Sequence, residues 1–413
     1  MAKRVTKSVK NEVGNRVSLK KGESIRSDGM LMYRYMDTDG KRKTIYSSTI
    51  EGLREKEAQI VVDGVKGLRS DGKTKTLDEV FTEWKELKRG IRDHTMQNYS
   101  WVYTQYAHGG FGKSRIKALT PADVRRFYNG LYDERGLAVS TIDNLQTVLR
   151  QVFDFAVQQR YIDINPCTKA MVELRKAHCD GGQKHEALTL DEQKRLLGFL
   201  RGHDTYKHWY PTFAVMVGTG MRVGELTGLR WCDIDFEKGT IDVSHTLVYY
   251  KDDSTKKMEF KISPPKSKAG RRTIKMLDFV RDALLEEKAS QEATGASCKA
   301  VVNGYTNFVF VNRFGDVQHQ GTLNKALRRI IRDANYEAID KGLTLLPPFS
   351  CHNLRATFCT RLAEEGVPLK ISMKLMGHDD MRTTMAVYTS VCPDWEEREL
   401  QSVNNLFKNF HAS

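Results

Sequence analysis

Arginine, histidine and tyrosine residues suited to chemistry on a phosphodiester gather in the second half of the chain. They belong to the motifs Gly220-Met-Arg-Val-Gly-Glu225, His352-Asn-Leu-Arg355 and Leu375-Met-Gly-His378, which are followed by Tyr388. A phosphodiester is anionic, so it must be neutralised before a nucleophile can approach, and guanidinium groups pair with its oxygens without losing their protons. A tyrosine hydroxyl can then attack and form a covalent bond. The residue types therefore indicate phosphodiester cleavage through a covalent intermediate.

The spacing within two of these motifs is close to one helical turn. Arg222 and Glu225 are three residues apart, as are His352 and Arg355, so on a helix each pair would share one face. We therefore expect each motif to lie on a helix and to present two groups to one phosphate. Taken singly, the arginine and glutamate could form an ordinary surface ion pair and each histidine could be a packed core residue. Together and in this order, the motifs favour a catalytic site.

In type and order, these motifs resemble those of the tyrosine recombinases, the phage integrase family, from about Leu188 onward. Members of this family are DNA strand transferases that cleave and rejoin DNA through a 3′-phosphotyrosyl intermediate. The resemblance implies Tyr388 as the nucleophile. The complete set of implied catalytic residues is Arg222, Glu225, Lys268, His352, Arg355, His378 and Tyr388.

The resemblance also implies a role for each group around the tyrosine. Arg222 and Arg355 would clamp the non-bridging phosphate oxygens, where charge grows in the transition state. Glu225 would orient its arginine. His352 would accept the tyrosine proton as a general base, because its ordinary pKa lies near neutrality, and His378 would donate a hydrogen bond to the phosphate.

A lysine completes this set, and the family carries it on a β-hairpin between the two arginine motifs. The run 266–274 matches that hairpin, and Lys268 is the preferred candidate for the acid that protonates the departing 5′ oxygen, with Lys266 in reserve. Only one lysine can be the acid, and we expect most cations of this segment to be solvated or to contact phosphate. They are Lys256, Lys257, Lys261, Lys266, Lys268, Arg271 and Arg272.

The composition favours a polyanionic partner. The 413 residues include 66 lysines and arginines against 52 acidic residues, which gives a net charge of +14 and a pI of about 9.3, typical of nucleic-acid binding. Residues 1–50 alone hold 12 basic and 5 acidic residues, half of the excess. The sequence has neither an apolar run of membrane-spanning length nor the apolar core of a signal peptide. We therefore expect a cytoplasmic, nucleoid-associated bacterial protein with no membrane partner.

The basic N-terminal region, residues 1–72, has the pattern of an α+β module. Strands are predicted at 24–26, 30–35 and 41–46, with turns at Asp28-Gly29 and at 37–40, and a helix at 50–65. The module resembles the arm-binding domain of phage and conjugative-transposon integrases, in which a three-stranded sheet enters the major groove. A solvated charged hairpin is the competing interpretation. The DNA contacts implied by the resemblance are Arg26, Tyr33, Arg34, Tyr35, Lys41, Arg42 and Lys43.

The rest of the chain divides into helical and mixed segments, so the fold class is multidomain. Residues 73–165 are predicted to form an all-α domain that resembles the core-binding domain of the family. Its helices are expected at 76–88, 94–107, 121–134 and 140–159. A linker follows at 166–186, then a mixed α/β catalytic domain at 187–394 with strands at 240–250 and 260–274. An amphipathic tail helix is expected within 395–413.

The cysteines raise the alternative of a metal site, because Cys351, Cys359 and Cys392 lie near the histidine motifs. The chain has seven scattered cysteines and no C-x-x-C pair, a pattern typical of buried thiols in a reducing compartment. We therefore expect neither a metal nor any other cofactor. A phosphotyrosyl intermediate agrees with this, since it conserves the bond energy needed for rejoining.

The expected function is site-specific recombination that integrates and excises a mobile element. The resemblance implies a homotetramer on double-stranded attachment sites, of core and arm type, with an excisionase and a host DNA-bending protein as accessory partners. Two alternatives share the fold or the chemistry: a catalytically silent DNA-binding regulator and a type IB topoisomerase-like enzyme. Covalent trapping on DNA discriminates against the first, and a requirement for two duplexes against the second.

Strand cleavage should proceed in excess chelator with no nucleotide present, because the sequence shows neither a metal ligand set nor a phosphate-binding glycine loop. The measurement is covalent adduct formation on a nicked attachment-site duplex with and without EDTA. Loss of the adduct in EDTA would overturn the expectation.

Overall fold

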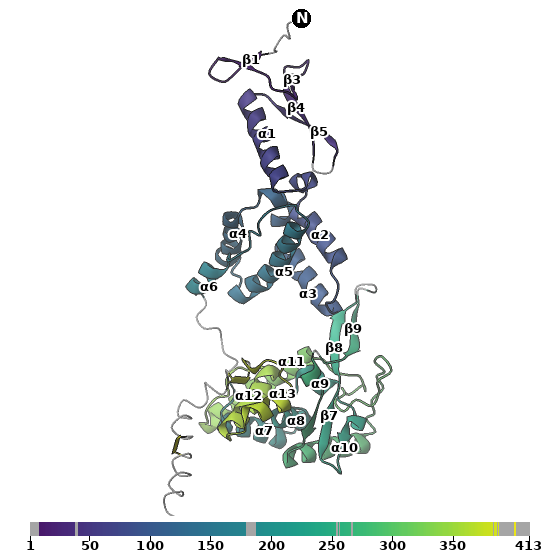
Figure 1. Ribbon diagram of the computed structural model, residues 1–413. Coiled ribbons are helices and arrows are strands. Elements are labelled where there is room, and N and C mark those ends of the chain that lie inside the picture. Colours follow the sequence, from purple (N-terminus) through teal and green to yellow (C-terminus); the bar gives the residue numbers. More distant parts are fainter. Residues whose placement is uncertain are drawn as a thin grey trace, which may run out of the picture. The chain divides into compact units, whose positions relative to one another are not determined.

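The structure is a computed structural model (Figure 1). It describes residues 8–37, 40–178, 187–252, 255, 257–265, 267–382, 384–385, 387 and 400–401. The chain divides into two compact units, residues 1–182 and 183–413. The first unit holds the basic N-terminal module and a helical domain, and the second holds a mixed α/β domain. The predicted multidomain fold class is confirmed.

The N-terminal module contains the predicted three-stranded sheet followed by a helix. Antiparallel strands β3 (Glu23–Ile25), β4 (Leu31–Met36) and β5 (Arg42–Ser47) precede α1 (Ile50–Val65). Thr49 caps α1 by accepting a hydrogen bond from the Gly52 backbone N–H at 3.2 Å, which satisfies one of the donors left open at a helix start. One face of the sheet packs on α1 through a small apolar core of Leu31, Ile50 and Leu53.

A second hairpin, which the sequence analysis did not predict, precedes this sheet. It pairs β1 (Ser8–Lys10) with β2 (Arg16–Ser18) in antiparallel register. The turn between them is held by the Asn11 side chain, which accepts from the Asn15 backbone N–H at 2.6 Å. Strands of three residues carry almost no periodic signal, and only Val9 and Val17 contact the core of the module.

The helical domain forms the rest of the first unit. Its helices are α2 (Leu77–Leu87), α3 (Asp93–Tyr106), α4 (Pro121–Asp133), α5 (Val139–Gln158) and α6 (Val172–His178). The first four agree with the predicted ranges to about one residue at each end, and two of them, α2 and α4, begin at capping boxes. Thr76, for example, forms a reciprocal capping box with Glu79. One apolar stripe of α5 is fully buried: Ile142, Leu145, Leu149, Val152 and Ala156.

The helical domain continues past residue 165, where the sequence analysis ended it. Helix α6 lies within the predicted linker 166–186, and Cys167, Met171 and Leu174 are buried in the same core as α5. The side-chain amide of Gln146 donates to the Cys167 carbonyl at 2.8 Å. The prediction followed the proline and glycine signals at the two ends of this stretch and overlooked the short apolar segment between them. Residues 179–186 lie outside the described part of the chain.

The second unit combines helices with two small sheets. Its helices are α7 (Leu190–Gly202), α8 (Tyr210–Thr219), α9 (Val223–Thr227), α10 (Asp278–Thr294), α11 (Gln320–Lys341), α12 (Cys351–Glu364) and α13 (Leu369–Met376). One sheet has the strand order β10 (Arg272–Lys275), β7 (Thr240–Val243), β6 (Ile234–Asp235), and the other pairs β8 (Thr246–Lys251) with β9 (Met258–Ser263). No helix in the described residues is long and apolar enough to cross a membrane.

The two long strands predicted for this unit are wrong in detail, because each is broken. The first is interrupted at Ser244-His245, where the buried His245 ring approaches the Gly228 carbonyl at 2.7 Å through Nε2. The second ends at Pro264-Pro265, residues that lack a backbone N–H for a ladder. The chain then leaves the β8–β9 hairpin, and β10 pairs with β7 of the other sheet.

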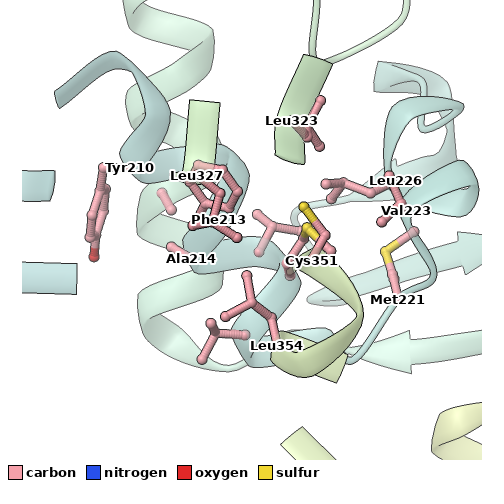
Figure 2. Close-up of a cluster of buried hydrophobic side chains, with 14 of the residues drawn as sticks. Tyr210, Phe213, Ala214, Met221, Val223, Leu226, Leu323, Leu327, Cys351 and Leu354 are labelled. Atoms are coloured by element: carbon pink, nitrogen blue, oxygen red, sulfur yellow. The ribbon is translucent and has the colours of Figure 1, made fainter. Parts of the chain in front are cut away.

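The apolar core of the second unit is built around α8. Every residue of α8 is buried, and Figure 2 shows Phe213 and Ala214 of this helix in one cluster with side chains of α9, α11 and α12, including Leu327 and Leu354. Because α8 is packed on all sides, the residue that ends it, Gly220, has a fixed position. The first arginine motif follows directly.

Candidate active site

Arg222 stands at the start of α9 and not within it. Its backbone is extended (φ −68°, ψ 150°), and it is the N-cap of the helix. The expectation that Arg222 and Glu225 share a helix face is therefore wrong. Instead, Glu225 folds back on the cap: its carboxylate accepts from the Arg222 backbone N–H at 3.0 Å and from Nη1 at 2.8 Å. The three-residue spacing is that of a capping box.

Glu225 also pairs with a residue that the sequence analysis grouped with the solvated cations. Arg272 donates from Nη2 to Glu225 Oε2 at 2.9 Å, and both side chains are almost completely buried. The signal that could have found it is the alternation of β10, in which Arg272 and Ile274 are buried while Thr273 and Lys275 are exposed.

His352 and Arg355 lie on α12 one turn apart, as the sequence predicts. Ser350 caps the helix, and its backbone N–H donates to the Asn353 side chain at 2.9 Å. His352 is exposed on the first turn, whereas Arg355 is 4% exposed. The Arg355 guanidinium donates from Nη1 to the Gly220 carbonyl at 2.5 Å, so it contacts the end of α8.

The carboxyl end of α13 brings the arginines together. Carbonyls in the last turn of a helix lack intrahelical partners and carry partial negative charge, so they are natural acceptors for guanidinium groups. Gly377, which ends the helix with φ +64°, completes the turn. Three consecutive carbonyls each accept from a different arginine: Leu375 from Arg272 Nε at 2.7 Å, Met376 from Arg355 Nη2 at 2.5 Å and Gly377 from Arg222 Nη2 at 3.2 Å.

Lys268 does not lie on a β-hairpin, contrary to the sequence prediction. It opens a 3-10 turn, Lys268–Gly270, in the connection between β9 and β10, and it is exposed. This connection reaches the arginines through its backbone, because the Gly270 carbonyl accepts from Arg272 Nη1 at 3.3 Å. The reserve candidate, Lys266, lies outside the described residues.

His378 follows the arginine-binding turn directly. Its Nδ1 lies 2.8 Å from the hydroxyl oxygen of the buried Thr384. Burial, followed by the positive charge of Arg355 and its neighbours, lowers the pKa of His378 to about 4. The ring is therefore neutral at neutral pH. In the tautomer in which Nδ1 accepts from the Thr384 hydroxyl, the single ring proton lies on Nε2 and can be donated in a hydrogen bond.

The cluster has a surplus of positive charge. Burial, followed by repulsion from Arg222, lowers the pKa of Arg355 to about 9, so the group stays charged at neutral pH at an electrostatic cost. Burial alone would raise the pKa of Glu225, but the hydrogen bond and charge of Arg272 and the contacts with Arg222 bring it below the usual value. Three guanidinium groups therefore surround one carboxylate, a combination suited to receiving a phosphodiester anion.

Tyr388 lies outside the described residues. The residue before it, Val387, packs against Phe358, Cys359 and Met376 of α12 and α13, the helices that supply Arg355 and the arginine-binding turn. Within the part of the chain that the structure describes, no group of three or more histidine, cysteine or acidic residues could hold a metal ion. Of the cysteines considered for a metal site, Cys351 and Cys359 are buried, and Cys392 is outside the described part.

The residues expected to contact DNA in the N-terminal module lie on two faces of its sheet. The register pairs Tyr33 with Ile45 and Tyr35 with Lys43 on the face that packs against α1. The outer face, opposite α1, is formed by Met32, Arg34, Met36, Arg42, Thr44 and Tyr46. Arg26 joins this outer face, with its guanidinium 5.9 Å from the Tyr46 ring centroid, and Lys41 lies in the turn before β5. The geometry favours Arg26, Arg34 and Arg42 as DNA contacts.

Comparisons with known proteins agree with this organisation. The phage integrase family matches residues 186–393, the DNA-binding domain of Tn916 integrase matches 8–64, and the N-terminal SAM-like domain of phage integrases matches 76–132. The transposase of transposon Tn916 from Enterococcus faecalis is 26% identical over 399 residues, covering 94% of this chain and 95% of the relative. A XerC-like tyrosine recombinase from Caldanaerobacter subterraneus subsp. tengcongensis is 28% identical over 388 residues, covering 90% and 94%.

A solved structure shares the fold of most of the chain. The Tn1549 transposon integrase (residues 82–397 of that protein), in complex with a circular intermediate DNA, superposes with a TM-score of 0.69 at 24% identity. The match covers 78% of this chain and 99% of that one. Fold and sequence together define an enzyme that cleaves and transfers DNA strands. The chain belongs to the phage integrase family, as a tyrosine recombinase of the conjugative-transposon type.

Gly377 offers a prediction with a matched control, Gly342. Both end a helix with φ +64°, but a Cβ at Gly377 would lie 3.0 Å from the Ala269 carbonyl oxygen and from Arg272 Nη1, whereas at Gly342 it would meet nothing within 4 Å. Alanine in this left-handed conformation costs about 1–2 kcal/mol. We expect both alanine variants to lower the free energy of unfolding by about that amount in urea titrations, and Gly377→Ala alone to slow strand cleavage. Equal cleavage by the two variants would contradict the role of the turn.

Proposed function

We propose that this recombinase integrates and excises a mobile DNA element, with Tyr388 as the nucleophile that cuts each strand. In the proposed step the Tyr388 oxygen bonds to phosphorus and the bond to the 5′ oxygen breaks. The product is a 3′-phosphotyrosyl linkage with a free 5′ hydroxyl. The single observation that carries the proposal is the set of three arginines seated on consecutive carbonyls around one buried carboxylate.

The arginines act on the phosphate in this proposal. Arg222, whose side chain is 45% exposed, reaches the non-bridging oxygens from the solvent side, and Arg355 meets them from α12. Both are held before DNA arrives, so little reorganisation is needed as charge develops. His378 adds a hydrogen bond from its neutral ring.

Two proton transfers complete the step. His352, exposed on the first turn of α12, accepts the proton of Tyr388. Lys268, with Lys266 as the alternative, gives a proton to the departing 5′ oxygen. In the reverse direction a 5′ hydroxyl attacks the phosphotyrosyl bond and releases the tyrosine. Rejoining therefore needs no external energy source, and neither step as drawn requires a metal or a nucleotide.

The number of DNA strands to be cleaved suggests how many protomers assemble. Each protomer contributes one Tyr388, and exchange between two duplexes requires four cleavages, so we propose a homotetramer on two core-type sites, active at the bacterial nucleoid. The N-terminal module would hold a second, arm-type site. The tail, 395–413, of which the structure describes only residues 400 and 401, would pack on a neighbouring protomer and close the ring. An excisionase and a host bending protein are the proposed accessory partners.

Trapping the covalent intermediate tests the reaction. A nicked recombination-site duplex should yield a protein–DNA adduct that survives denaturation with the wild-type enzyme. Tyr388→Phe should form none while its DNA affinity stays within about twofold, because only the nucleophilic oxygen is lost. Tyr336→Phe, at an exposed tyrosine of α11, is the matched control and should behave as wild type. Formation of an adduct by Tyr388→Phe would disprove the assignment of Tyr388 as the nucleophile. Absence of an adduct with the wild-type enzyme would favour a catalytically silent DNA-binding regulator.

The two faces of the N-terminal sheet give a second test. Arg42 lies on the outer face and Lys43 on the α1 face, where Lys43 pairs with Asp37 at 3.2 Å. Arg42→Gln and Lys43→Gln each remove one charge. We expect Arg42→Gln to weaken arm-site binding about tenfold, within the range of a lost base contact, and Lys43→Gln about twofold, with core-site cleavage unchanged in both. A larger effect at Lys43 in gel-shift titrations would place DNA on the other face.

A further inference from the structure

Arg272 connects parts of the site that come from distant segments of the chain. Its Nη2 bonds to Glu225 of α9, its Nε to the Leu375 carbonyl at the end of α13, and its Nη1 to the Gly270 carbonyl in its own connection. Three of the five N–H donors of the guanidinium are therefore engaged. Arg222 makes a comparable pair of connections, to Glu225 and to the Gly377 carbonyl.

Burial separates Arg272 from the arginine that faces the phosphate. The Arg272 side chain is 2% exposed, whereas that of Arg222 is 45% exposed. Arg272 also packs close to Gly377, since a Cβ there would approach its Nη1 at 3.0 Å and its Cδ at 3.2 Å. All three nitrogens of the Arg272 guanidinium donate to protein acceptors, whereas the hydrogen bonds of Arg355 to Gly220 and Met376 come from Nη1 and Nη2. Its action must therefore pass through the groups it holds.

The first action of Arg272 is to share the Glu225 carboxylate with Arg222. Glu225 Oε1 pairs with Arg222 Nη1, while Oε2 receives both the Arg222 backbone N–H and Arg272 Nη2. If Glu225 were bonded to Arg222 alone, the two charges would form a closed, neutral pair. With Arg272 on the same carboxylate, the trio keeps a net positive charge, and Arg222 remains able to bind an anion.

The placement of His378 is the second action of Arg272. Leu375, whose carbonyl Arg272 holds, lies three residues before His378, and Gly377, on which Arg272 packs, lies one residue before it. We infer that Arg272 is a positioning residue for strand cleavage: by holding Glu225 and the end of α13 together, it aligns Arg222 and His378 on the scissile phosphate. The inference rests on the proposed function of the site.

Arg272→Lys is the first test, because lysine keeps the charge but a single ammonium group cannot span Glu225, Leu375 and Gly270. We expect single-turnover cleavage of a nicked half-site to fall at least tenfold, with half-site affinity within twofold of wild type. Lys275→Arg, an exposed charge-conserving change on the same strand, is the control and should match wild type in both assays. Cleavage by Arg272→Lys at the wild-type rate would overturn the inference.

Two further measurements separate positioning from a general structural defect. The double variant Arg272→Lys, Glu225→Gln should lose a smaller factor in cleavage rate than the product of the two single losses, because both residues act on one alignment. A fully multiplicative loss of rate counts against action through Glu225.

The pH dependence of cleavage is the second measurement. In Arg272→Gln the principal group that lowers the pKa of Glu225 is absent, while burial still raises that pKa. The acid limb of its pH–rate profile should therefore move to higher pH, with activity lost first as pH falls. A rate reduced equally at every pH would contradict the inference.

The outcomes also distinguish this inference from the proposed function. Adduct formation by wild type and Lys275→Arg but not by Arg272→Lys supports both. If wild type and control form no adduct, the proposed function fails, whatever Arg272 does. Should Arg272→Lys fail to bind the half-site, Arg272→Gln replaces it in the same cleavage assay, and a wild-type rate there overturns the inference.

Discussion

Repulsion among three buried or half-buried guanidinium groups is the constraint on which the proposed active site depends. One carboxylate, Glu225, and three backbone carbonyls at the end of α13 offset it. Burial first, and then repulsion from Arg222, lowers the pKa of Arg355, so holding this group charged costs free energy before substrate is bound. Such unrelieved charge is tolerable only where a well-packed core supplies the remaining stability. The apolar helix α8, buried along its whole length, fulfils that requirement next to the site.

The choice of acceptors explains how so many segments can meet at one point. Arg222, Arg272 and Arg355 come from a helix cap, a strand and a helix, and each ends on a main-chain oxygen of one short turn. Main-chain carbonyls move only with the backbone, so they hold the guanidinium groups more rigidly than flexible side chains could. His378 directly follows this turn in the chain, so the position of the turn determines the positions of the arginines and of His378 together.

Local patterns in the sequence predicted much of this structure, whereas features that depend on contacts between distant segments were missed. The predicted helix ranges of the helical domain agree with the structure to about one residue at each end, and the three-residue spacing placed His352 and Arg355 on one helix. Arg272 was overlooked because a strand residue's inward or outward direction depends on which strand it pairs with, and β10 pairs with β7 across a long connection. The same kind of spacing misled for Arg222 and Glu225, since a cap and a helix face can share it. The short strands β1 and β2 carry too few residues for a periodic signal.

The reliance on carbonyls of α13 has a consequence for how this site can vary among relatives. Side chains at positions 375 and 376 are not the acceptors, so these residues can be exchanged as long as the helix and its packing persist. A change in length is different: one inserted or deleted residue turns everything that follows by about 100° around the helix axis. Three acceptors would then point away from their arginines at once, and His378 with them. The site should thus tolerate substitutions on α13 that keep its packing, including that of the buried Ser372 and Met376, but not insertions or deletions. The length of this helix is therefore constrained together with its buried positions.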